Sequence, residues 1–256
     1  MEIPENELLA CAVTTARKAG DFARANRHRR TEVNKSATHD VKLQMDVETQ
    51  QVADAVVLEH FPDHTILGEE DQTDQNSPYT WIIDPIDGTL NYARGMHHWC
   101  TSIAVQHQGE ILAGCIYCPM YDELFTATKH GPALCNDEPI HISNTSDLRE
   151  ATALFGAGKP DEDASFDMRI FDTLINATRI ARLLGAAAID ICSVAAGRAD
   201  AYVDMGIYLW DFAAAGLIAE RAGAQITCFP EMEPFQHAYL CTNGHLHKRL
   251  HALYDA

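Results

Sequence analysis

The segment Trp81–Thr89, with the sequence WIIDPIDGT, decides how this chain is interpreted. Its apolar run, 81–83, predicts a buried strand, and Pro85 is expected to end that strand. The turn that follows would present two carboxylates, Asp84 and Asp87, at one exposed point. We expect them to lie close enough to share a divalent cation.

The end of this segment also suits a phosphate group. Gly88 has no Cβ, so its backbone can come close to a ligand. Thr89 offers a hydroxyl and an N–H group where a helix is expected to begin, and helix starts favour anions. Hard oxygen ligands beside an anion site indicate a magnesium-dependent phosphate enzyme. D-P-x-D-G is also ordinary turn chemistry, so these residues alone leave both interpretations open.

The composition limits the partners that the chain can have. It has 256 residues, 46% of them hydrophobic, which is enough for a substantial core. With 37 acidic and 19 basic residues the formal charge is −18, so we expect the surface to repel nucleic acid and anionic membranes. A phosphate substrate would be repelled too, unless bound cations invert the local field. The acidity therefore fits a metal site.

Other features of the sequence indicate a reducing, cytoplasmic setting. There are eight cysteines, and we expect them to be buried, reduced thiols. Cys115 and Cys118 form a CxxC pair without a second pair, which argues against a zinc site. No signal peptide is recognisable, and no apolar run approaches the ~20 residues of a membrane span. We expect a cytoplasmic protein without membrane contact.

The order of elements predicts an α/β protein in two halves. Apolar periodicity predicts helices over 5–27 and 47–61, a hairpin or loop over 31–45, and strands over 65–67, 100–107, 110–118 and 123–128. Later come strands over 153–155, 180–184, 201–203 and 239–241 and helices over 164–176, 185–197, 212–222 and 245–254. We expect an α+β half, 1–147, packed against an α/β half, 148–256.

Acidic residues follow three of the expected strand ends or precede helices. Glu69 and Glu70 follow a short strand, and Asp211 precedes an apolar helix. Each has an ordinary alternative, a solvated loop for the glutamates and a helix N-cap for Asp211. Because α/β proteins bind ligands at strand ends, these acids would converge with Asp84 and Asp87 if all lay at one edge. The sequence leaves that convergence open.

The motifs and their spacing resemble the inositol monophosphatase family of magnesium-dependent, lithium-sensitive phosphomonoesterases. The matching segments are GEE at 68–70, WIIDPIDGTLNY at 81–92, GAAAIDICSVAAGRADAYVDMG at 185–206 and LWDFAAAGLIAERAGA at 209–224. The resemblance runs from the first helix to Thr242. It implies a layered αβαβα sandwich of the inositol monophosphatase/fructose-1,6-bisphosphatase type. It also implies phosphomonoester hydrolysis with two or three Mg²⁺ ions, for which Mn²⁺ can substitute.

The resemblance assigns roles to individual residues. The implied metal ligands are Glu69, Asp84, Asp87, Asp211 and the backbone carbonyl of Ile86. The implied catalytic groups are Glu69, Asp87 and Thr89, which would serve in-line attack by a metal-activated water without a phosphoenzyme. The implied substrate contacts are Asp87, Gly88, Thr89, Asp204, Asp211 and the backbone near Ala187. Lys35 and Asp46 match a mobile loop beside a third, weaker metal site.

Departures from the family pattern fall on specificity elements. The segment Val41–Met45 lacks the threonine that the family usually has there, which puts the third metal in doubt. Ala186 stands where serine or threonine is frequent. Asp204 replaces a usual glutamate and is one methylene shorter. The implied metal ligands are all intact.

Several functions remain open at this stage. The leading expectation is hydrolysis of inositol 1-phosphate or a related polyol phosphate. Sister activities are the alternatives: fructose-1,6-bisphosphatase, histidinol-phosphatase or 3′-phosphoadenosine 5′-phosphate phosphatase. Leu90 stands where the nucleotide enzymes carry lysine, and Trp210 is present where histidinol enzymes tend to replace it, although 91–99 resembles part of the histidinol group. A non-catalytic binding protein of the same fold is the alternative from another class.

The resemblance also implies a homodimer acting on a small-molecule phosphate ester. We expect the segment around Trp99 and Cys100 to belong to the core or to a dimer interface. His97 and His98 have no companion at metal-ligand spacing, so we expect them at the surface or at the substrate rim.

Overall fold

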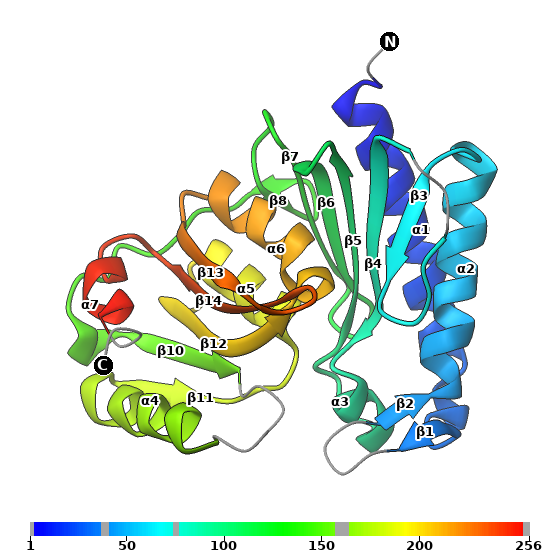
Figure 1. Cartoon of the computed structure of the whole chain (residues 1–256). Helices are drawn as coiled ribbons and strands as arrows, with labels where there is room; N and C mark the ends of the chain where they lie inside the picture. Colours follow the sequence, from blue (N-terminus) through cyan, green and yellow to red (C-terminus); the bar gives the residue numbers. More distant parts are fainter. Residues whose placement is uncertain (1–2, 37–40, 74–76, 157–163, 253–256) are drawn as a thin grey trace.

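Two β-sheets form the framework of the chain (Figure 1). The structure is a computed structural model that describes residues 3–36, 41–73, 77–156 and 164–252. One sheet has seven strands in the order β3-β4-β5-β6-β7-β8-β9, and the other has five in the order β11-β10-β12-β14-β13. Strand β1 (Val33–Ser36) pairs antiparallel with β2 (Val41–Leu43), which agrees with the first of the two alternatives, hairpin or loop, expected over 31–45.

The seven-stranded sheet comes from the first part of the chain. Its strands are β3 (Thr65–Gly68), β4 (Tyr79–Asp87), β5 (Cys100–His107), β6 (Glu110–Cys118), β7 (Glu123–Thr128), β8 (Leu134–Cys135) and β9 (Glu138–Pro139). Only β3 and β4 pair in parallel, and the strands from β4 onward form an antiparallel meander. Helices α1 (Glu5–Ala25) and α2 (Gln44–His60) pack on its outer face, as Figure 1 shows.

The five-stranded sheet comes from the second part of the chain. Its strands are β10 (Thr152–Gly156), β11 (Ile180–Arg182), β12 (Ala201–Tyr208), β13 (Gln225–Glu233) and β14 (Gln236–Thr242). Helices α4 (Ala164–Ala177) and α7 (His247–His251) lie on its outer face. Short elements complete the chain: α3 (Thr89–Arg94) and the 3₁₀ turns η1 (Arg27–Arg29) and η2 (Leu148–Glu150).

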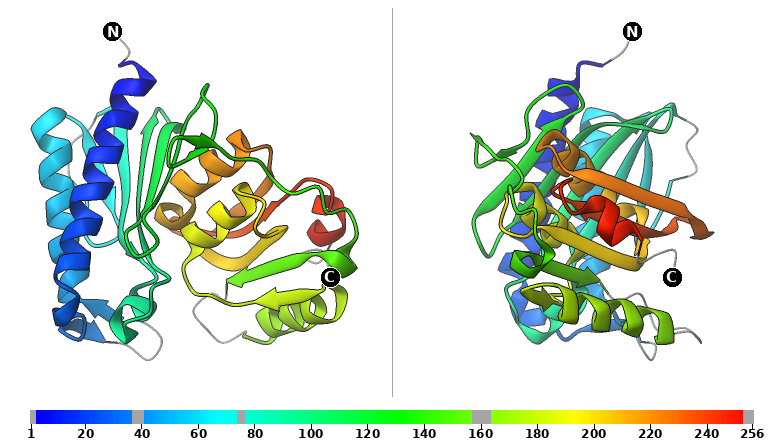
Figure 2. Two further views of the ribbon diagram at one scale, coloured as in Figure 1. Left: turned by 180° about the vertical axis from the view of Figure 1, so that it is seen from behind. Right: turned by 90° about the vertical axis from the view of Figure 1, so that its left-hand side faces the viewer.

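Helices α5 (Ala187–Ala195) and α6 (Leu209–Arg221) lie between the two sheets (Figure 2). Their side chains form one core with inward-facing residues of both sheets, including Ile82, Ile116, Tyr202 and Tyr239. The layers are therefore helices, sheet, helices, sheet, helices, which confirms the predicted αβαβα sandwich. None of the described helices is both long and apolar enough to cross a membrane.

Small residues let these layers come close together. On α1, Leu8, Ala12, Ala16 and Ala23 are fully buried at helical spacing. A Cβ on Gly114 of β6 would lie 2.9 Å from the backbone of Ala214 in α6. The absence of a side chain at that point therefore sets how closely α6 packs against the sheet.

Two local expectations are wrong. Pro85 does not end its strand, because β4 continues to Asp87 and pairs with β5 again through an irregular register between Asp84 and Asp87. Such an irregularity tolerates a residue that has no N–H to donate. The second is the absence of an expected strand over 225–233, where the structure has β13, a mostly exposed edge strand.

Candidate metal and phosphate site

Three carboxylates from distant parts of the chain meet where β4 ends. Asp84, Asp87 and Asp211 each offer one oxygen, and these oxygens all lie within 4.8 Å of one another. The first two lie in the last part of β4, and the third lies in the first turn of α6. Asp84 and Asp87 are buried. Of the convergence that the sequence left open, the part that joins Asp211 to Asp84 and Asp87 is therefore present.

Backbone N–H groups hold each of these carboxylates in place. Ile86 N–H donates to Asp84 Oδ1 (3.0 Å), and Tyr208 N–H donates to Asp211 Oδ2 (2.9 Å) at the start of α6. Asp211 therefore also caps its helix, as the ordinary alternative proposed, from the third helical position rather than from the N-cap.

Asp87 is held from the other half of the chain. Its Oδ1 accepts a hydrogen bond from Ala187 N–H (3.1 Å), and its Oδ2 accepts one from Ala188 N–H (2.9 Å). The Cys100 thiol also donates to Asp87 Oδ2 (3.5 Å). The first turn of α5 thus fixes the orientation of a carboxylate that belongs to the end of β4.

The crowding of these acids makes their ionised forms unfavourable. Burial raises the pKa of Asp84 well above its usual range, and the charges of Glu69, Asp87 and Asp211 raise it further. Burial raises the pKa of Asp87 to about 6, opposed by the hydrogen bond from Ala188. Burial and the charge of Asp87 raise the pKa of Asp211 to about 7. A bound divalent cation would reverse this penalty, and three hard oxygen donors are a set that suits Mg²⁺.

Glu69 lies beside the three aspartates rather than within their group. Its N–H donates to Ile83 O (3.1 Å), and its charge contributes to the raised pKa of Asp84, so its carboxylate acts on the same centre. Glu69 also lines a cavity of about 280 Å³, and Trp210 and Phe235 line the same cavity.

The Gly-Thr pair lies where the sequence placed it. Gly88 has a left-handed backbone (φ 87°) and α3 begins at Thr89. The Thr89 hydroxyl donates to the carbonyl of Ile86 (3.0 Å). Since its proton is used in that bond, the oxygen of Thr89 is left as an acceptor.

Asp204 and Ala187, which were expected to contact the substrate, make hydrogen bonds within the protein. Asp204 is buried and accepts hydrogen bonds from the Tyr202 hydroxyl (2.5 Å) and from Gly206 N–H (2.8 Å). The N–H of Ala187 donates to Asp87. A substrate role for Asp204 and Ala187 stays a prediction.

Of the two expected third-metal residues, Asp46 does not join the three aspartates. Asp46 Oδ2 accepts a hydrogen bond from Leu43 N–H (2.7 Å) at the start of α2, where Asp46 is buried. Within the described residues Asp46 is not part of the group of metal-ligating atoms. Lys35 belongs to β1, but its side chain lies outside the described part of the structure.

Sequence reasoning missed three polar residues that surround Asp87. His98, expected at the surface or rim, is mostly buried, and its Nε2 lies 3.0 Å from Oδ1 of Asp190, a buried residue of α5. The amide of Asn91 donates to the carbonyls of His98 and Leu184 (2.8 Å each). The available signal was an aspartate inside the apolar helix AAIDIC, because a buried acid needs a partner.

The neighbouring Trp99 and Cys100 are both fully buried, in two different clusters of the core. Of the two alternatives for this segment, core or dimer interface, the structure therefore confirms the core.

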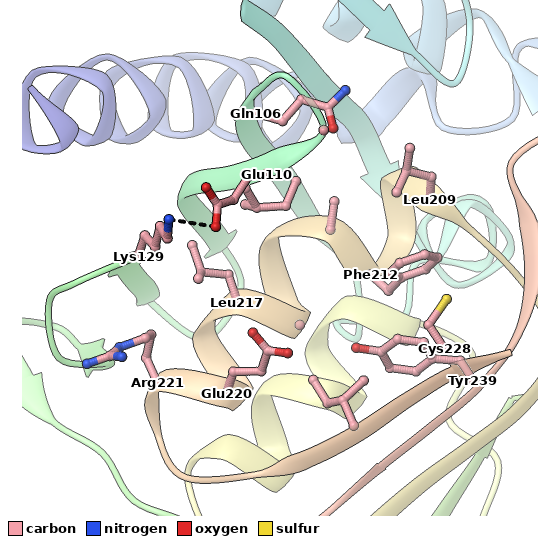
Figure 3. A pocket seen from close by; sticks show the side chains of 15 residues that line it. Gln106, Glu110, Lys129, Leu209, Phe212, Leu217, Glu220, Arg221, Cys228 and Tyr239 are labelled. Atoms are coloured by element: carbon pink, nitrogen blue, oxygen red, sulfur yellow. Dashed lines mark ion pairs between the residues drawn. The ribbon is translucent and has the colours of Figure 1, made fainter. Parts of the chain in front are cut away.

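A second cavity, of about 500 Å³, lies along the other side of α6 (Figure 3). Figure 3 shows Phe212 and Tyr239 on one side of the cavity and the Lys129–Glu110 ion pair (2.6 Å) on the other. None of the predicted site residues lines it. The chemistry suggested by the sequence is therefore located at the end of β4 and not in this cavity.

A layered α/β sandwich that gathers acids from β4 and α6 beside a Gly-Thr turn defines a class, the metal-dependent phosphate enzymes of mixed α/β fold. Comparison with known proteins narrows the class. The chain belongs to the inositol monophosphatase family, whose model matches residues 5–255. Members of this family are metal-dependent phosphatases, and the chain is accordingly a phosphomonoester hydrolase.

Individual relatives agree with this assignment. The chain is 34% identical over 248 residues to "Nus factor SuhB" of Pasteurella multocida, which covers 94% of this chain and 90% of that protein. It is 34% identical over 223 residues to "Inositol-1-monophosphatase" of Bacillus subtilis, covering 84% of each. Among solved structures, the inositol monophosphatase of Anabaena superposes with a TM-score of 0.84 at 30% identity and covers 97% of this chain and 95% of that one.

Proposed function

We propose that the protein hydrolyses a small-molecule phosphate monoester with the help of Mg²⁺, and that inositol 1-phosphate is the first candidate substrate. The observation that carries this proposal is the convergence of Asp84, Asp87 and Asp211 on one point. The protein around these three acids does not stabilise their ionised forms, because burial raises the pKa of each of them. A cation at this point would offset their charge and attract the anionic substrate.

The residues present fit the cation. Glu69, Asp84, Asp87, Asp211 and the carbonyl of Ile86 would hold two Mg²⁺ ions, or Mn²⁺ in their place. Lys35 and Asp46 would lie near a third. Bound there, the metal supplies positive charge to the phosphoryl oxygens and lowers the pKa of the attacking water.

The remaining groups of the chain would orient the reaction in line. Thr89 would accept a hydrogen bond from the attacking water, because its own hydroxyl proton is donated to the Ile86 carbonyl. Glu69 would orient the same water from the opposite side. Gly88 and Thr89 would direct their N–H groups to the phosphate, and Asp204 and Ala187 would face the alcohol that leaves. We propose direct displacement, without a phosphoenzyme.

Assembly and setting belong to the same proposal. Leu90, Met96, Tyr121 and Leu183 are apolar and about half exposed. They lie in segments joined by the contacts of Asn91 and His98, and they would be covered in a homodimer. We propose a lithium-sensitive, cytoplasmic homodimer without nucleic-acid or membrane partners, divided at residue 147 into an α+β and an α/β half. Light scattering of the purified protein measures the dimer directly.

A phosphate-release panel in Mg²⁺ tests the activity. It should contain inositol 1-phosphate, fructose 1,6-bisphosphate, histidinol phosphate and 3′-phosphoadenosine 5′-phosphate. We expect release from inositol 1-phosphate at the highest kcat/KM and loss of release with EDTA. Faster release from another ester would transfer the assignment to that sister activity.

A non-catalytic role is the second candidate, because several relatives are named Nus factor rather than phosphatase. Absence of phosphate release from every ester, with Mn²⁺ bound normally, would favour it. In the purified protein the two candidates are therefore separated by one panel and one binding measurement.

A further inference from the structure

The turn that carries Asp87 is fastened to the start of α5 by contacts that the proposed chemistry does not use. The amide nitrogen of Asn91 donates to the carbonyls of Leu184 (2.8 Å) and Gly185 (3.2 Å), the residues that lead into α5. It also donates to the carbonyl of His98 (2.8 Å). One side chain thus joins the segment after β4 to a segment more than 90 residues away.

A second contact that joins the two segments lies one helical turn further along α5. His98 Nε2 and Asp190 Oδ1 are 3.0 Å apart, and the side chain of Asp190 is 1% exposed. A buried carboxylate without a partner is strongly unfavourable, and His98 is the partner that the structure provides. Asp190 also lies in the first turn of α5, where negative charge is favoured by the helix dipole.

Between the contacts of Asn91 and of the His98–Asp190 pair, the turn itself lies close to the start of α5. A Cβ on Gly88 would lie 3.0 Å from the Cβ of Ala186 and 3.0 Å from the carbonyl of His98. Because residue 88 has no side chain, the two segments can lie this close together. Asn91 and His98 prevent them from moving apart.

This contact determines how Asp87 is presented. Both of its oxygens accept N–H groups from the first turn of α5, those of Ala187 and Ala188. If α5 moved away by even a fraction of an ångström, these bonds would lengthen and the carboxylate would be free to rotate. The cation that Asp87 and Asp211 would share needs a fixed orientation, since Mg²⁺ tolerates little departure from octahedral geometry.

We propose that Asn91 and the His98–Asp190 pair are positioning residues that hold α5 against the metal-binding turn and thereby set the affinity of the cation bound by Asp87 and Asp211. This rests on the proposed function, because it assumes that the site holds a divalent cation. Supporting partners of metal ligands typically change metal affinity about 10- to 100-fold when they are removed. We expect the lower end of this range for each of the two contacts.

The test is direct Mn²⁺ binding to the full-length, metal-free protein by electron paramagnetic resonance, together with the Mg²⁺ concentration that gives half-maximal phosphate release. His98→Phe should weaken Mn²⁺ binding at the site of Asp87 and Asp211 about tenfold and raise the half-maximal Mg²⁺ concentration by a similar factor. His98→Gln should recover most of this loss, because its amide can still donate to Asp190. Asn91→Leu should resemble His98→Phe.

Two further variants separate positioning from general stability. His98→Phe with Asp190→Leu removes the contact without leaving a buried charge, so it keeps the test valid if His98→Phe alone does not fold. His130→Phe is the matched control, since it breaks a histidine–carboxylate pair to Glu5 (2.6 Å) that joins α1 to the loop after β7. The double variant should lose Mn²⁺ affinity, and the control should not.

The proposal is overturned if His98→Phe, or the double variant, binds Mn²⁺ and responds to Mg²⁺ within twofold of the unmodified protein. A lower melting temperature with unchanged metal affinity would overturn it as well, because the pair would then be only structural. If the unmodified protein itself binds no Mn²⁺, the proposed function fails instead, and the two failures are distinguished by that single measurement.

Discussion

Replacing Asp211 with asparagine should make the metal-free protein more stable while removing its response to magnesium. Burial and the charge of Asp87 raise the pKa of Asp211 from its ordinary 3.8 to about 7. At 1.36 kcal/mol per pKa unit, keeping this group ionised in the folded protein costs about 4 kcal/mol above pH 7. Asparagine carries no charge and can still accept the Tyr208 N–H, so we expect a gain of about 2–4 kcal/mol at pH 8.

The sign of the pH dependence is fixed by the direction of the shift. The folded pKa of Asp211 lies above its unfolded value, so the protonated group stabilises the fold fully below about pH 4. That contribution is lost as the pH rises through about 7. The metal-free protein should therefore lose stability between pH 5 and pH 8, and Asp211→Asn should lose less. At pH 5 the difference between the two proteins should fall to roughly a third of its value at pH 8, and below about pH 4 it should vanish.

Thermal unfolding in EDTA at pH 5 and pH 8 measures the effect of the substitution on stability, and the same experiment with saturating Mg²⁺ measures the stabilisation by the metal. For a chain of this size, 2–4 kcal/mol corresponds to a rise in Tm of roughly 5–12 °C at pH 8. Magnesium should stabilise the unmodified protein by about 2.7 kcal/mol at 100 times its Kd and the variant much less. The exposed Asp63→Asn is the control. A variant no more stable than the unmodified protein in EDTA at pH 8, or one equally stabilised by Mg²⁺, would refute the reasoning.

Three further outcomes follow from the described contacts. Gly114→Val places a side chain against the backbone of Ala214 and should destabilise the protein by about 3 kcal/mol or more in urea unfolding; an unchanged midpoint would contradict the packing. Burial lowers the pKa of His64, whose Nδ1 accepts the Trp81 indole N–H (3.0 Å). The stability that neutral His64 contributes is therefore present above pH 6.5 and lost on acidification. His64→Gln should reduce the loss of stability between pH 6.5 and pH 5, and urea denaturation at both pH values measures this loss. Of the eight cysteines only Cys228 is exposed, and none is in a disulfide. Ellman's reagent should therefore react quickly with about one thiol in the native protein and with all eight after unfolding. A fast reaction of several thiols in the native protein would contradict the burial of the other cysteines.

The fold was largely predictable because its elements carry their own periodic signals. The stripe of apolar residues on α1 and the nearly continuous apolar runs of β5 and β6 are read directly from the sequence. Strand β13 was missed because it is an edge strand with a polar, mostly exposed end that contains a proline. The expectation that Pro85 ends its strand was wrong because a local irregularity in the pairing of β4 with β5 has no sequence signature of its own.

One part of the candidate site could be predicted from the sequence, and the other part depends on how the helices pack. Asp84, Asp87, Gly88 and Thr89 form a local motif, so their proximity needed no knowledge of the fold. Asp211 could be suspected because helix starts and strand ends gather at the edge of an α/β sheet. Its actual distance from Asp84 depends on how α6 packs, which Gly114 controls from another strand.

The pair His98 and Asp190 lies beyond such reasoning. The two residues are 92 positions apart, and neither belongs to a motif with the other. Their contact exists because α5 enters between the sheets beside the turn after β4, and only the packed structure shows this. Sequence analysis could register that Asp190 is an acid in an apolar helix, but it could not name the partner.

A crystal of the protein grown with excess Mn²⁺ and measured at the manganese absorption edge tests the central idea most directly. We predict anomalous peaks bound by Asp84, Asp87 and Asp211, with Glu69 and the Ile86 carbonyl completing the ligand set. Anomalous density elsewhere in the molecule, with these carboxylates bound to no ion, would contradict it.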